Sequence, residues 1–262
     1  MKIVTTKAKE FNFIRALVHG DSGIGKTTSI KTLPRDITLV AGAERSLLPL
    51  GGSDFNATRI ETWDDVRTMI AELSRGLEIN GKAVKILAID SLSQISELCK
   101  LHIVEVDRKA LTKERTGGNK ERPQGIYDDQ MTIEDWGVYG TRMTNMISAV
   151  CQLPMHIIFT CLSNWHEDKL SGATNRTPAV QGKLATNCPA FFDLVMHMEA
   201  SKDPEGRPIR VFRTFNDGRV IAKDASGKLD LFEPANWKRI FRKVLDNETE
   251  ADKTAKEAQR AA

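Results

Sequence analysis

The chain has 262 residues, of which 40% are hydrophobic and 28% charged, and its formal net charge is +3 at pH 7. These values are typical of a globular protein, and the length suits one α/β domain with a single substantial core. No stretch approaches the roughly 18 apolar residues of a membrane span, and the first residues lack the apolar run of a secretory signal. The 4 cysteines are scattered, which argues against a zinc site or a disulfide framework. We therefore expect a soluble, cytoplasmic protein without a membrane partner.

Short apolar segments alternate with helical patterns along the first two thirds of the chain. The segments that we predict to be strands are residues 13–19, 37–41, 57–60, 84–89 and 156–161. The helices predicted between them are Lys26–Leu33, which Pro34 ends, a helix that begins after the N-cap residue Thr62, and residues 91–106 and 136–152. This alternation predicts an α/β fold with a mostly parallel sheet flanked by helices on both faces.

The pattern changes after Phe191. Further strands are predicted over residues 193–198, 209–215 and 219–223, and the turn Asn216-Asp217-Gly218 predicts that the last two form an antiparallel hairpin. A final helix over residues 234–245 precedes a polar tail, residues 247–262, whose only apolar side chains are alanines. We expect that tail to be frayed or disordered, and residues 1–246 to form a single domain.

A glycine-rich motif separates the first predicted strand from the first helix. Glycines allow successive backbone N–H groups to face phosphate oxygens. Lys26 is expected to reach the β- and γ-phosphates, and the Thr27 hydroxyl to hold Mg²⁺. The motif therefore predicts a phosphate-binding loop for ATP and Mg²⁺. It matches G-x-x-x-x-G-K-[ST] at every fixed position, and the residues predicted to contact the nucleotide are Gly20, Asp21, Ser22, Gly23, Ile24, Gly25, Lys26, Thr27 and Thr28.

Two carboxylates follow neighbouring predicted strands. Asp90 closes the run Lys85–Asp90 and is expected to hold the metal, directly or through water; the alternative is that it caps the following helix. Glu44 follows the second strand and is the candidate for orienting or deprotonating the attacking water. The alternative for Glu44 is a surface glutamate paired with Arg45.

Two long connections are candidates for contact with a nucleic acid. The first, about residues 107–134, contains a basic run with Gly117-Gly118-Asn119, which suits a flexible loop that follows a phosphate backbone. The second, about residues 163–180, has nearly balanced charge and one aromatic residue able to stack on a base. The alternative for the first is a solvated surface loop. The candidate DNA-contacting residues are Arg108, Lys109, Lys113, Arg115, Lys120, Arg122, Trp165, Lys169 and Arg176.

Taken together, these residues resemble the RecA-like recombinase ATPases. Besides the phosphate loop, the likeness is carried by Ala43–Pro49, by Ile89–Leu92, and by the stretch from Gln181-Gly182-Lys183-Leu184 to Phe191-Phe192-Asp193. The resemblance implies that Glu44 and Lys26 are catalytic and that the two connections are DNA-binding loops. The glutamine with which the family commonly senses the γ-phosphate is missing, so Thr160 or Ser163 would have to serve.

The compact length is most similar to short phage P-loop proteins, namely the RecA-like branch of single-strand annealing proteins (Sak type). That likeness implies ATP-dependent binding of single-stranded DNA in recombination or annealing, ATP hydrolysis, and assembly into filaments or rings. A single-strand DNA-binding protein is a candidate partner, and a phage-encoded chain would act in the cytoplasm of its bacterial host. Arg219 and Lys223 are candidates for completing the nucleotide site of an adjacent subunit; the alternative is that they lie on an ordinary exposed hairpin.

Two other functions stay open on the sequence. A phosphate loop is equally compatible with a small-molecule or nucleotide kinase, in which the long basic loop would be a lid. A binding module that uses ATP as a slow structural switch is the second alternative. Loss of ATP hydrolysis on replacing Glu44 by Gln, with ATP and DNA binding retained, would support the leading interpretation over both alternatives.

Overall fold

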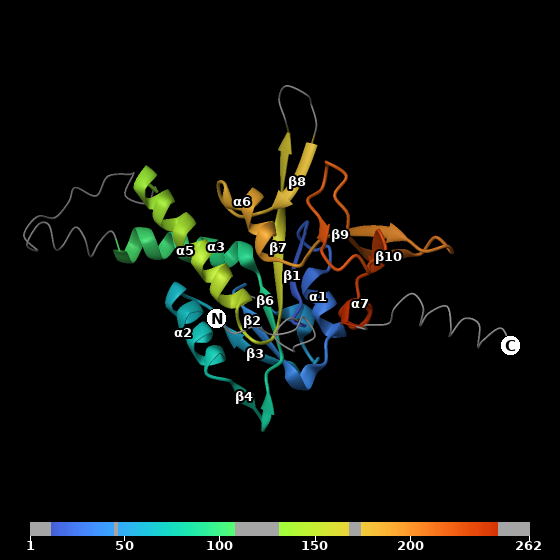
Figure 1. Cartoon of the computed structure of the whole chain (residues 1–262), viewed down its shortest axis with the longest axis horizontal. Coiled ribbons are helices and arrows are strands. Elements are labelled where there is room, and N and C mark those ends of the chain that lie inside the picture. Colours follow the sequence, from blue (N-terminus) through green and yellow to red (C-terminus); the bar gives the residue numbers. More distant parts are fainter. Residues whose placement is uncertain (1–11, 45–46, 108–130, 168–173, 246–262) are drawn as a thin grey trace, which may run out of the picture.

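The computed structural model describes residues 12–44, 47–107, 131–167 and 174–245 (Figure 1). The predicted tail, almost the whole of the first long connection and the tip of the second lie outside these ranges. Within the described ranges, no helix is long and apolar enough to cross a lipid bilayer.

The centre of the molecule is a 10-stranded mixed sheet in the order β12-β10-β9-β1-β7-β6-β2-β3, in which β11 also pairs with β9 and β8 with β7. Strands β3, β2, β6, β7, β1 and β9 run parallel, whereas β8, β10, β11 and β12 are antiparallel to their partners. The predicted fold class is confirmed. The strands are β1 Arg15–Gly20, β2 Thr38–Gly42, β3 Asn56–Arg59, β6 Ile86–Asp90, β7 His156–Glu167, β8 Thr174–Pro178, β9 Leu194–Lys202, β10 Pro208–Arg213, β11 Lys223–Asp224 and β12 Phe232–Pro234.

Helices cover both faces of this sheet, as the buried strand pattern requires. The larger set, α2, α3 and α5, packs on one face, and α1 and α7 pack on the other (Figure 1). Alternate residues of β1 point to opposite cores: Leu17 joins the first, and Ala16 and Val18 join the second. The helices are α1 Lys26–Ser29, α2 Trp63–Ser74, α3 Leu92–His102, α5 Ile133–Cys151, α6 Leu184–Asn187 and α7 Trp237–Leu245, and α3 ends in a π-helical turn over Ile103–Asp107.

Local capping explains where the long helices begin. The Thr62 hydroxyl accepts from the Asp65 backbone N–H while the Asp65 carboxylate accepts from the Thr62 N–H, which is a capping box. Thr132 and Asp135 form the same arrangement before α5, so this helix begins earlier than predicted. The first helix is shorter than its prediction, because α1 passes into a 3₁₀ turn over Ile30–Thr32 before Pro34.

Two predictions about connections were wrong. The second long connection is largely a β-hairpin: β7 continues to Glu167 and pairs with the antiparallel strand β8, so the hairpin projects from the sheet at the top of Figure 1. The turn at Asn216-Asp217-Gly218 does not join two paired strands, because β10 and β11 both pair with β9 instead of with each other. β9 is long enough to pair with both, which a local turn pattern does not reveal.

One hairpin was missed by the sequence analysis. Strands β4 (Glu78–Ile79) and β5 (Lys82–Ala83) flank Asn80-Gly81, and both turn residues have positive φ, 51° and 74°. Asn-Gly is the residue pair that favours such a turn.

Candidate functional site

The phosphate loop connects β1 to α1 at the carboxyl edge of the sheet. Gly20 ends β1, and a Cβ there would lie 2.8 Å from the carbonyl oxygen of Met198, so β1 approaches β9 too closely for a side chain. Gly25 has φ 110°, which an L side chain rarely adopts. The exposed residues Asp21, Ser22 and Gly23 leave the outer side of the loop open to solvent.

Lys26 holds the loop in its present shape. Its Nζ donates to the carbonyl oxygens of Gly20 at 2.9 Å and Asp21 at 2.8 Å, and the residue is buried. Burial lowers the pKa of Lys26 from its ordinary value, and Asp90 and Glu44 oppose that change. Because its present partners are neutral carbonyls, the ammonium carries charge that a bound anion can neutralise.

Asp90 is almost completely buried, and its carboxylate accepts hydrogen bonds from two hydroxyl groups. Thr27 Oγ1 donates to Asp90 Oδ2 at 2.8 Å, and the buried Thr160 hydroxyl donates to Asp90 Oδ1. The Asp90–Ser91 peptide is cis. Asp90 and Thr160 face each other because β6 and β7 are parallel neighbours, with Ile89 paired to Phe159.

These oxygen donors fit Mg²⁺. Mg²⁺ in nucleotide sites is held by one or two protein oxygens and by the phosphates, which matches one carboxylate beside one hydroxyl. The described residues contain no group of three histidine, cysteine, aspartate or glutamate side chains placed to enclose a metal. A metal at Thr27 and Asp90 would therefore need oxygens from the nucleotide and water.

Glu44 is brought to the same edge of the sheet. The carbonyl oxygen of Asp90 accepts from the backbone N–H of Ala43 at 2.8 Å and of Glu44 at 3.3 Å. The Ser91 hydroxyl donates to Glu44 Oε1 at 3.0 Å, and it also caps α3 by accepting from the Gln94 N–H. Backbone and side chain of Glu44 are thus both oriented by the segment that carries Asp90. The sequence analysis did not predict that Ser91 orients Glu44, although Ser91 directly follows the predicted metal ligand Asp90.

The β7–β8 hairpin is connected to the phosphate loop through Arg176 on β8. Arg176 Nη1 lies 3.4 Å from Asp21 Oδ2 and donates to His197 Nε2 at 2.9 Å. Its Cζ lies 3.9 Å from the centre of the Trp165 ring, and Trp165 itself is 56% exposed. Arg176 therefore contacts the loop and the hairpin aromatic at the same time.

Two buried histidines lie beside this connection. His19 and His197 are register partners on β1 and β9, and their ring centres are 4.8 Å apart. Nε2 of His19 donates to the Ile221 carbonyl at 2.7 Å, so Nδ1 accepts from the Ser163 hydroxyl at 2.8 Å. Burial, together with neighbouring cationic groups, lowers the pKa of His19 to about 3 and that of His197 to about 4. Both are neutral at pH 7.

The two candidates for a contact with an adjacent subunit lie apart from each other. Arg219 is exposed, and its backbone carbonyl accepts from the Arg176 N–H at 2.7 Å. Lys223 donates through Nζ to the Phe192 carbonyl at 2.8 Å, near the start of β9 and away from the phosphate loop. Their role stays a prediction.

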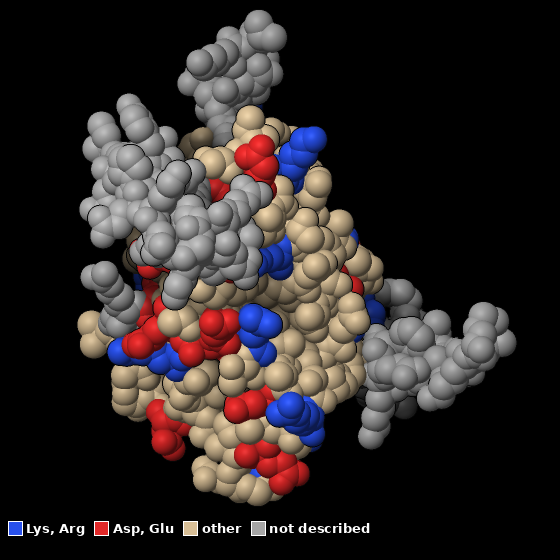
Figure 2. All heavy atoms as spheres, turned by 90° about the vertical axis from the view of Figure 1, so that its left-hand side faces the viewer, with Lys and Arg blue, Asp and Glu red and all other residues tan. Residues whose placement is uncertain are grey.

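The remaining predicted contacts depend on residues that the structure does not describe. The face formed by α2, α3 and α5 mixes acidic and basic side chains, without a continuous basic stripe among its described residues (Figure 2). The predicted residues outside the described ranges are Arg108, Lys109, Lys113, Arg115, Lys120, Arg122 and Lys169.

Comparison with known proteins gives a family and a set of distant structural similarities. Similar solved structures include the flagellar accessory protein FlaH from Methanocaldococcus jannaschii (10% identity, 87% of this chain and 91% of that chain covered, TM-score 0.39). They also include the RadB recombinase (12%, 82% and 91%, 0.41) and a KaiC-like protein from Pyrococcus horikoshii OT3 (13%, 78% and 80%, 0.37). No curated protein sequence matches.

The family comparison covers most of the chain. Residues 12–226 match the family described as AAA domain, a range that contains the phosphate loop, Glu44, Asp90 and the β7–β8 hairpin. Because this family model matches most of the chain, the chain belongs to the AAA domain family, and its mostly parallel sheet with a complete phosphate loop at the edge is the core of a P-loop ATPase.

Proposed function

We propose that this protein is an ATP-dependent single-stranded DNA-binding protein that hydrolyses ATP and assembles on DNA during recombination or annealing. The observation that carries the proposal is the contact of Arg176 with both Asp21 of the phosphate loop and Trp165 of the projecting hairpin. An exposed aromatic joined to a nucleotide loop is suited to make base stacking depend on the nucleotide.

The chemistry follows from the residues around the loop. Lys26 neutralises charge on the β- and γ-phosphates. Thr27 and Asp90 would hold Mg²⁺, which would supply further positive charge at the phosphate oxygens. Glu44 orients a water molecule toward the γ-phosphorus and accepts its proton. A bond forms between the water oxygen and phosphorus, the bond to the bridging oxygen breaks, and ADP leaves. Ser91 holds Glu44 in position for this step.

DNA contacts would come from the hairpin and from the basic connection. Trp165 offers a ring face to a base, and stacking of this kind contributes roughly 1–3 kcal/mol per base. The basic run at residues 108–122 would bind phosphates and make the affinity depend on salt. The likeness to the short phage annealing proteins supports assembly into a filament or ring, with Arg219 and Lys223 as candidates for contacts between subunits.

Replacing Glu44 by Gln tests the proposal. Glu44→Gln removes the proton acceptor but keeps the shape, so we expect ATP turnover to fall by at least about a hundredfold, with ATP-analogue and DNA binding retained. Glu61→Gln is the matched control, since Glu61 is an exposed glutamate that pairs with Arg59 on the neighbouring strand β3.

Phosphate release and the anisotropy of labelled single-stranded DNA are the two measurements. Unchanged turnover in the Glu44 variant would remove this residue from catalysis. If DNA neither binds with an ATP analogue nor alters turnover of the unmodified protein, the DNA-linked function is wrong. Phosphate transfer only when a small acceptor is supplied would indicate a kinase.

A further inference from the structure

Helix α7 separates its apolar side chains from its basic ones. Its apolar side packs on the sheet face opposite to that covered by α2, α3 and α5 (Figure 1). The helix contains no acidic residue, so its other side carries positive charge only. The basic residues on that side are Lys238, Arg239, Arg242 and Lys243.

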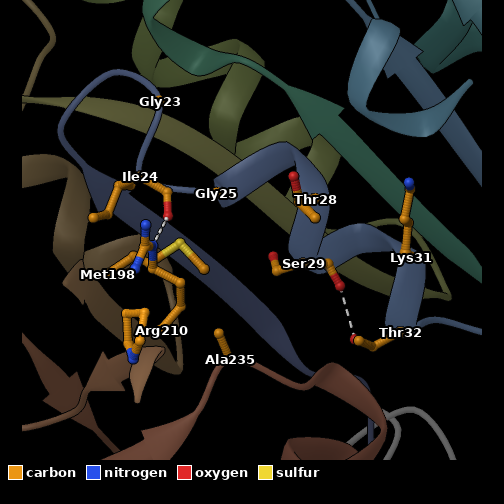
Figure 3. A pocket seen from close by; sticks show the side chains of 11 residues that line it. Gly23, Ile24, Gly25, Thr28, Ser29, Lys31, Thr32, Met198, Arg210 and Ala235 are labelled. Atoms are coloured by element: carbon orange, nitrogen blue, oxygen red, sulfur yellow. Dashed lines mark hydrogen bonds between the residues drawn. The ribbon is translucent and has the colours of Figure 1, made fainter. Parts of the chain in front are cut away.

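Hydrogen bonds to α1 and to the 3₁₀ turn after it fix the orientation of α7. The Trp237 backbone N–H donates to Thr32 Oγ1 at 2.8 Å, and Trp237 Nε1 donates to Ser29 Oγ at 3.1 Å. Thr32 and Ser29 are themselves joined, because Thr32 Oγ1 donates to the Ser29 carbonyl at 2.7 Å (Figure 3). Trp237 is fully buried. The basic side of α7 is therefore held at the surface.

Two of the basic residues of α7 pair with acidic residues near β12. Lys243 Nζ lies 2.6 Å from Asp230 Oδ2, and Arg239 Nε lies 3.2 Å from Glu233 Oε2. Lys243 contacts Glu233 as well. Glu233 is fully buried, and a buried carboxylate needs such partners. Arg239 and Lys243 are thus accounted for by the fold itself.

The other two, Lys238 and Arg242, are exposed, and within the part of the chain that the structure describes neither has an ion pair or a hydrogen bond. Four residues apart on a helix, they project from the same side, about 6 Å apart along the axis. Lys238 lies in the first turn, where the helix dipole disfavours positive charge, whereas α2 and α5 have acidic residues there. Helix stability therefore does not explain Lys238, and an anion from outside the chain is the partner that it suits.

The composition of this surface favours a nucleic-acid strand over a folded protein. None of the large apolar side chains of α7 is exposed, whereas protein interfaces are usually built around an apolar centre. Lysine and arginine side chains alone are sufficient to bind a phosphate backbone. The β7–β8 hairpin projects from the top of Figure 1, and α7 lies at the other sheet face, so a strand on α7 would be separate from one at the hairpin.

We propose that the basic side of α7 is a second nucleic-acid surface, at which Lys238 and Arg242 bind phosphates of a strand other than the one at the hairpin. The inference rests on the proposed function, in which the hairpin binds the first strand. Contacts to phosphates carry no sequence preference, so the second strand can have any sequence. One chain then holds two strands at once, which brings them together for annealing.

Capture of a second strand tests this inference. The full chain and an ATP analogue are bound to an immobilised oligonucleotide, and a labelled oligonucleotide that cannot pair with the first is then titrated. In Lys238→Gln/Arg242→Gln we expect unchanged binding to the immobilised strand and at least about tenfold weaker binding of the labelled one. The slope of log affinity against log salt for the labelled strand should become shallower by about 1.4, since each lost phosphate contact contributes about 0.7.

Two further variants complete the comparison. Arg67→Gln/Arg75→Gln removes the same charge from exposed positions in and directly after α2, on the opposite face of the sheet, and should capture the second strand like the unmodified protein. Lys238→Arg/Arg242→Lys keeps both charges and should retain capture as well. Loss of capture in either of these variants would contradict a role for the charges of α7.

The outcomes separate this inference from the proposed function. If the unmodified protein binds no first strand, the proposed function is wrong. If it binds the first strand but captures no second, or if Lys238→Gln/Arg242→Gln captures the second strand normally, α7 is not such a surface and the proposed function is unaffected. Equal loss of both strands would make α7 part of the first surface. A peptide of residues 246–252, with four acidic side chains, is the remaining competitor: if it displaces the second strand as effectively as an oligonucleotide, the surface binds acidic protein segments instead.

Discussion

Asp21 in the phosphate loop forms an ion pair with Arg176 on the β7–β8 hairpin, at 3.4 Å between Oδ2 and Nη1. The two residues come from distant parts of the sequence. Arg176 also lies against the Trp165 ring and donates to His197. Arg176 therefore connects Asp21 in the phosphate loop to the exposed Trp165 ring on the hairpin by direct contacts.

Replacing Asp21 by Asn should weaken the link between nucleotide and hairpin. The ion pair is partly exposed, so we expect the free energy of unfolding to change by less than about 1 kcal/mol. Nucleotide affinity should be retained, while the gain in single-stranded DNA affinity on adding an ATP analogue becomes smaller. Fluorescence anisotropy with and without the analogue measures this gain.

Asp36→Asn is the control for that prediction. Asp36 pairs with Lys82 at 2.9 Å and is similarly exposed, but it lies before β2, away from the loop. If Asp21→Asn keeps the full gain in single-stranded DNA affinity on adding the ATP analogue, the ion pair does not link the phosphate loop to the hairpin.

Trp165→Ala should weaken DNA binding without affecting the nucleotide. Loss of one stacking contact corresponds to roughly 1–3 kcal/mol, or about five- to a hundredfold in affinity. Phe232→Ala is the control, since Phe232 is also a partly exposed aromatic residue but lies on the edge strand β12. Equal DNA affinities for the Trp165 variant and the unmodified protein would exclude Trp165 from the interface.

Thr160→Val should raise the Mg²⁺ concentration needed for ATP hydrolysis. The substitution keeps the shape of the buried side chain but removes the hydroxyl that donates to Asp90. A hydrogen bond to a charged group contributes roughly 1.5–3 kcal/mol, so we expect the half-saturating concentration to rise by about tenfold or more. ATP turnover measured across a Mg²⁺ titration gives this value.

Thr177→Val provides the matched control for the Mg²⁺ titration. Thr177 is also a buried threonine, but its Oγ1 has no hydrogen-bond partner among the described residues. Its replacement should leave the titration unchanged and be neutral or slightly stabilising. If the two variants have the same Mg²⁺ dependence as the unmodified protein, Thr160 does not support the metal site.

Stability should decrease as the pH falls below about 6.5, because His19 and His197 have lowered pKa values in the folded protein, about 3 and about 4. Between about pH 4 and 6.5 the unfolded chain binds more protons than the folded chain, so folding stability rises with pH there. In this range the free energy of unfolding rises by at most about 1.4 kcal/mol per pH unit for each histidine.

Urea unfolding of the unmodified protein and of His197→Asn at pH 7 and pH 5.5 tests the pH prediction. The variant has one fewer histidine that becomes protonated on unfolding at pH 5.5, so its free energy of unfolding should change less between the two pH values. An identical change in both proteins would mean that His197 makes no contribution.

The sequence by itself determined the phosphate loop, the buried strands and the carboxylates at their ends. These features are local: a fixed motif, apolar runs and helix caps each depend on residues close together in the chain. Glu44 and Asp90 could be placed at one edge because parallel strands present their carboxyl ends on the same side. Their shared support, through Ser91 and the Asp90 carbonyl, needed the structure, since it depends on the side-by-side pairing of β2 with β6.

Only the tertiary structure decided which distant segments meet. The residues after Cys161 have nearly balanced charge and no strong strand pattern, yet they continue β7 because β8 supplies hydrogen-bond partners. β10 and β11 both pair with β9, although the turn between them favours a hairpin. Arg176 meets Asp21 because β8 returns along β7, which is itself the neighbour of β1. Such contacts depend on backbone pairing across long sequence separations, which composition and periodicity do not encode.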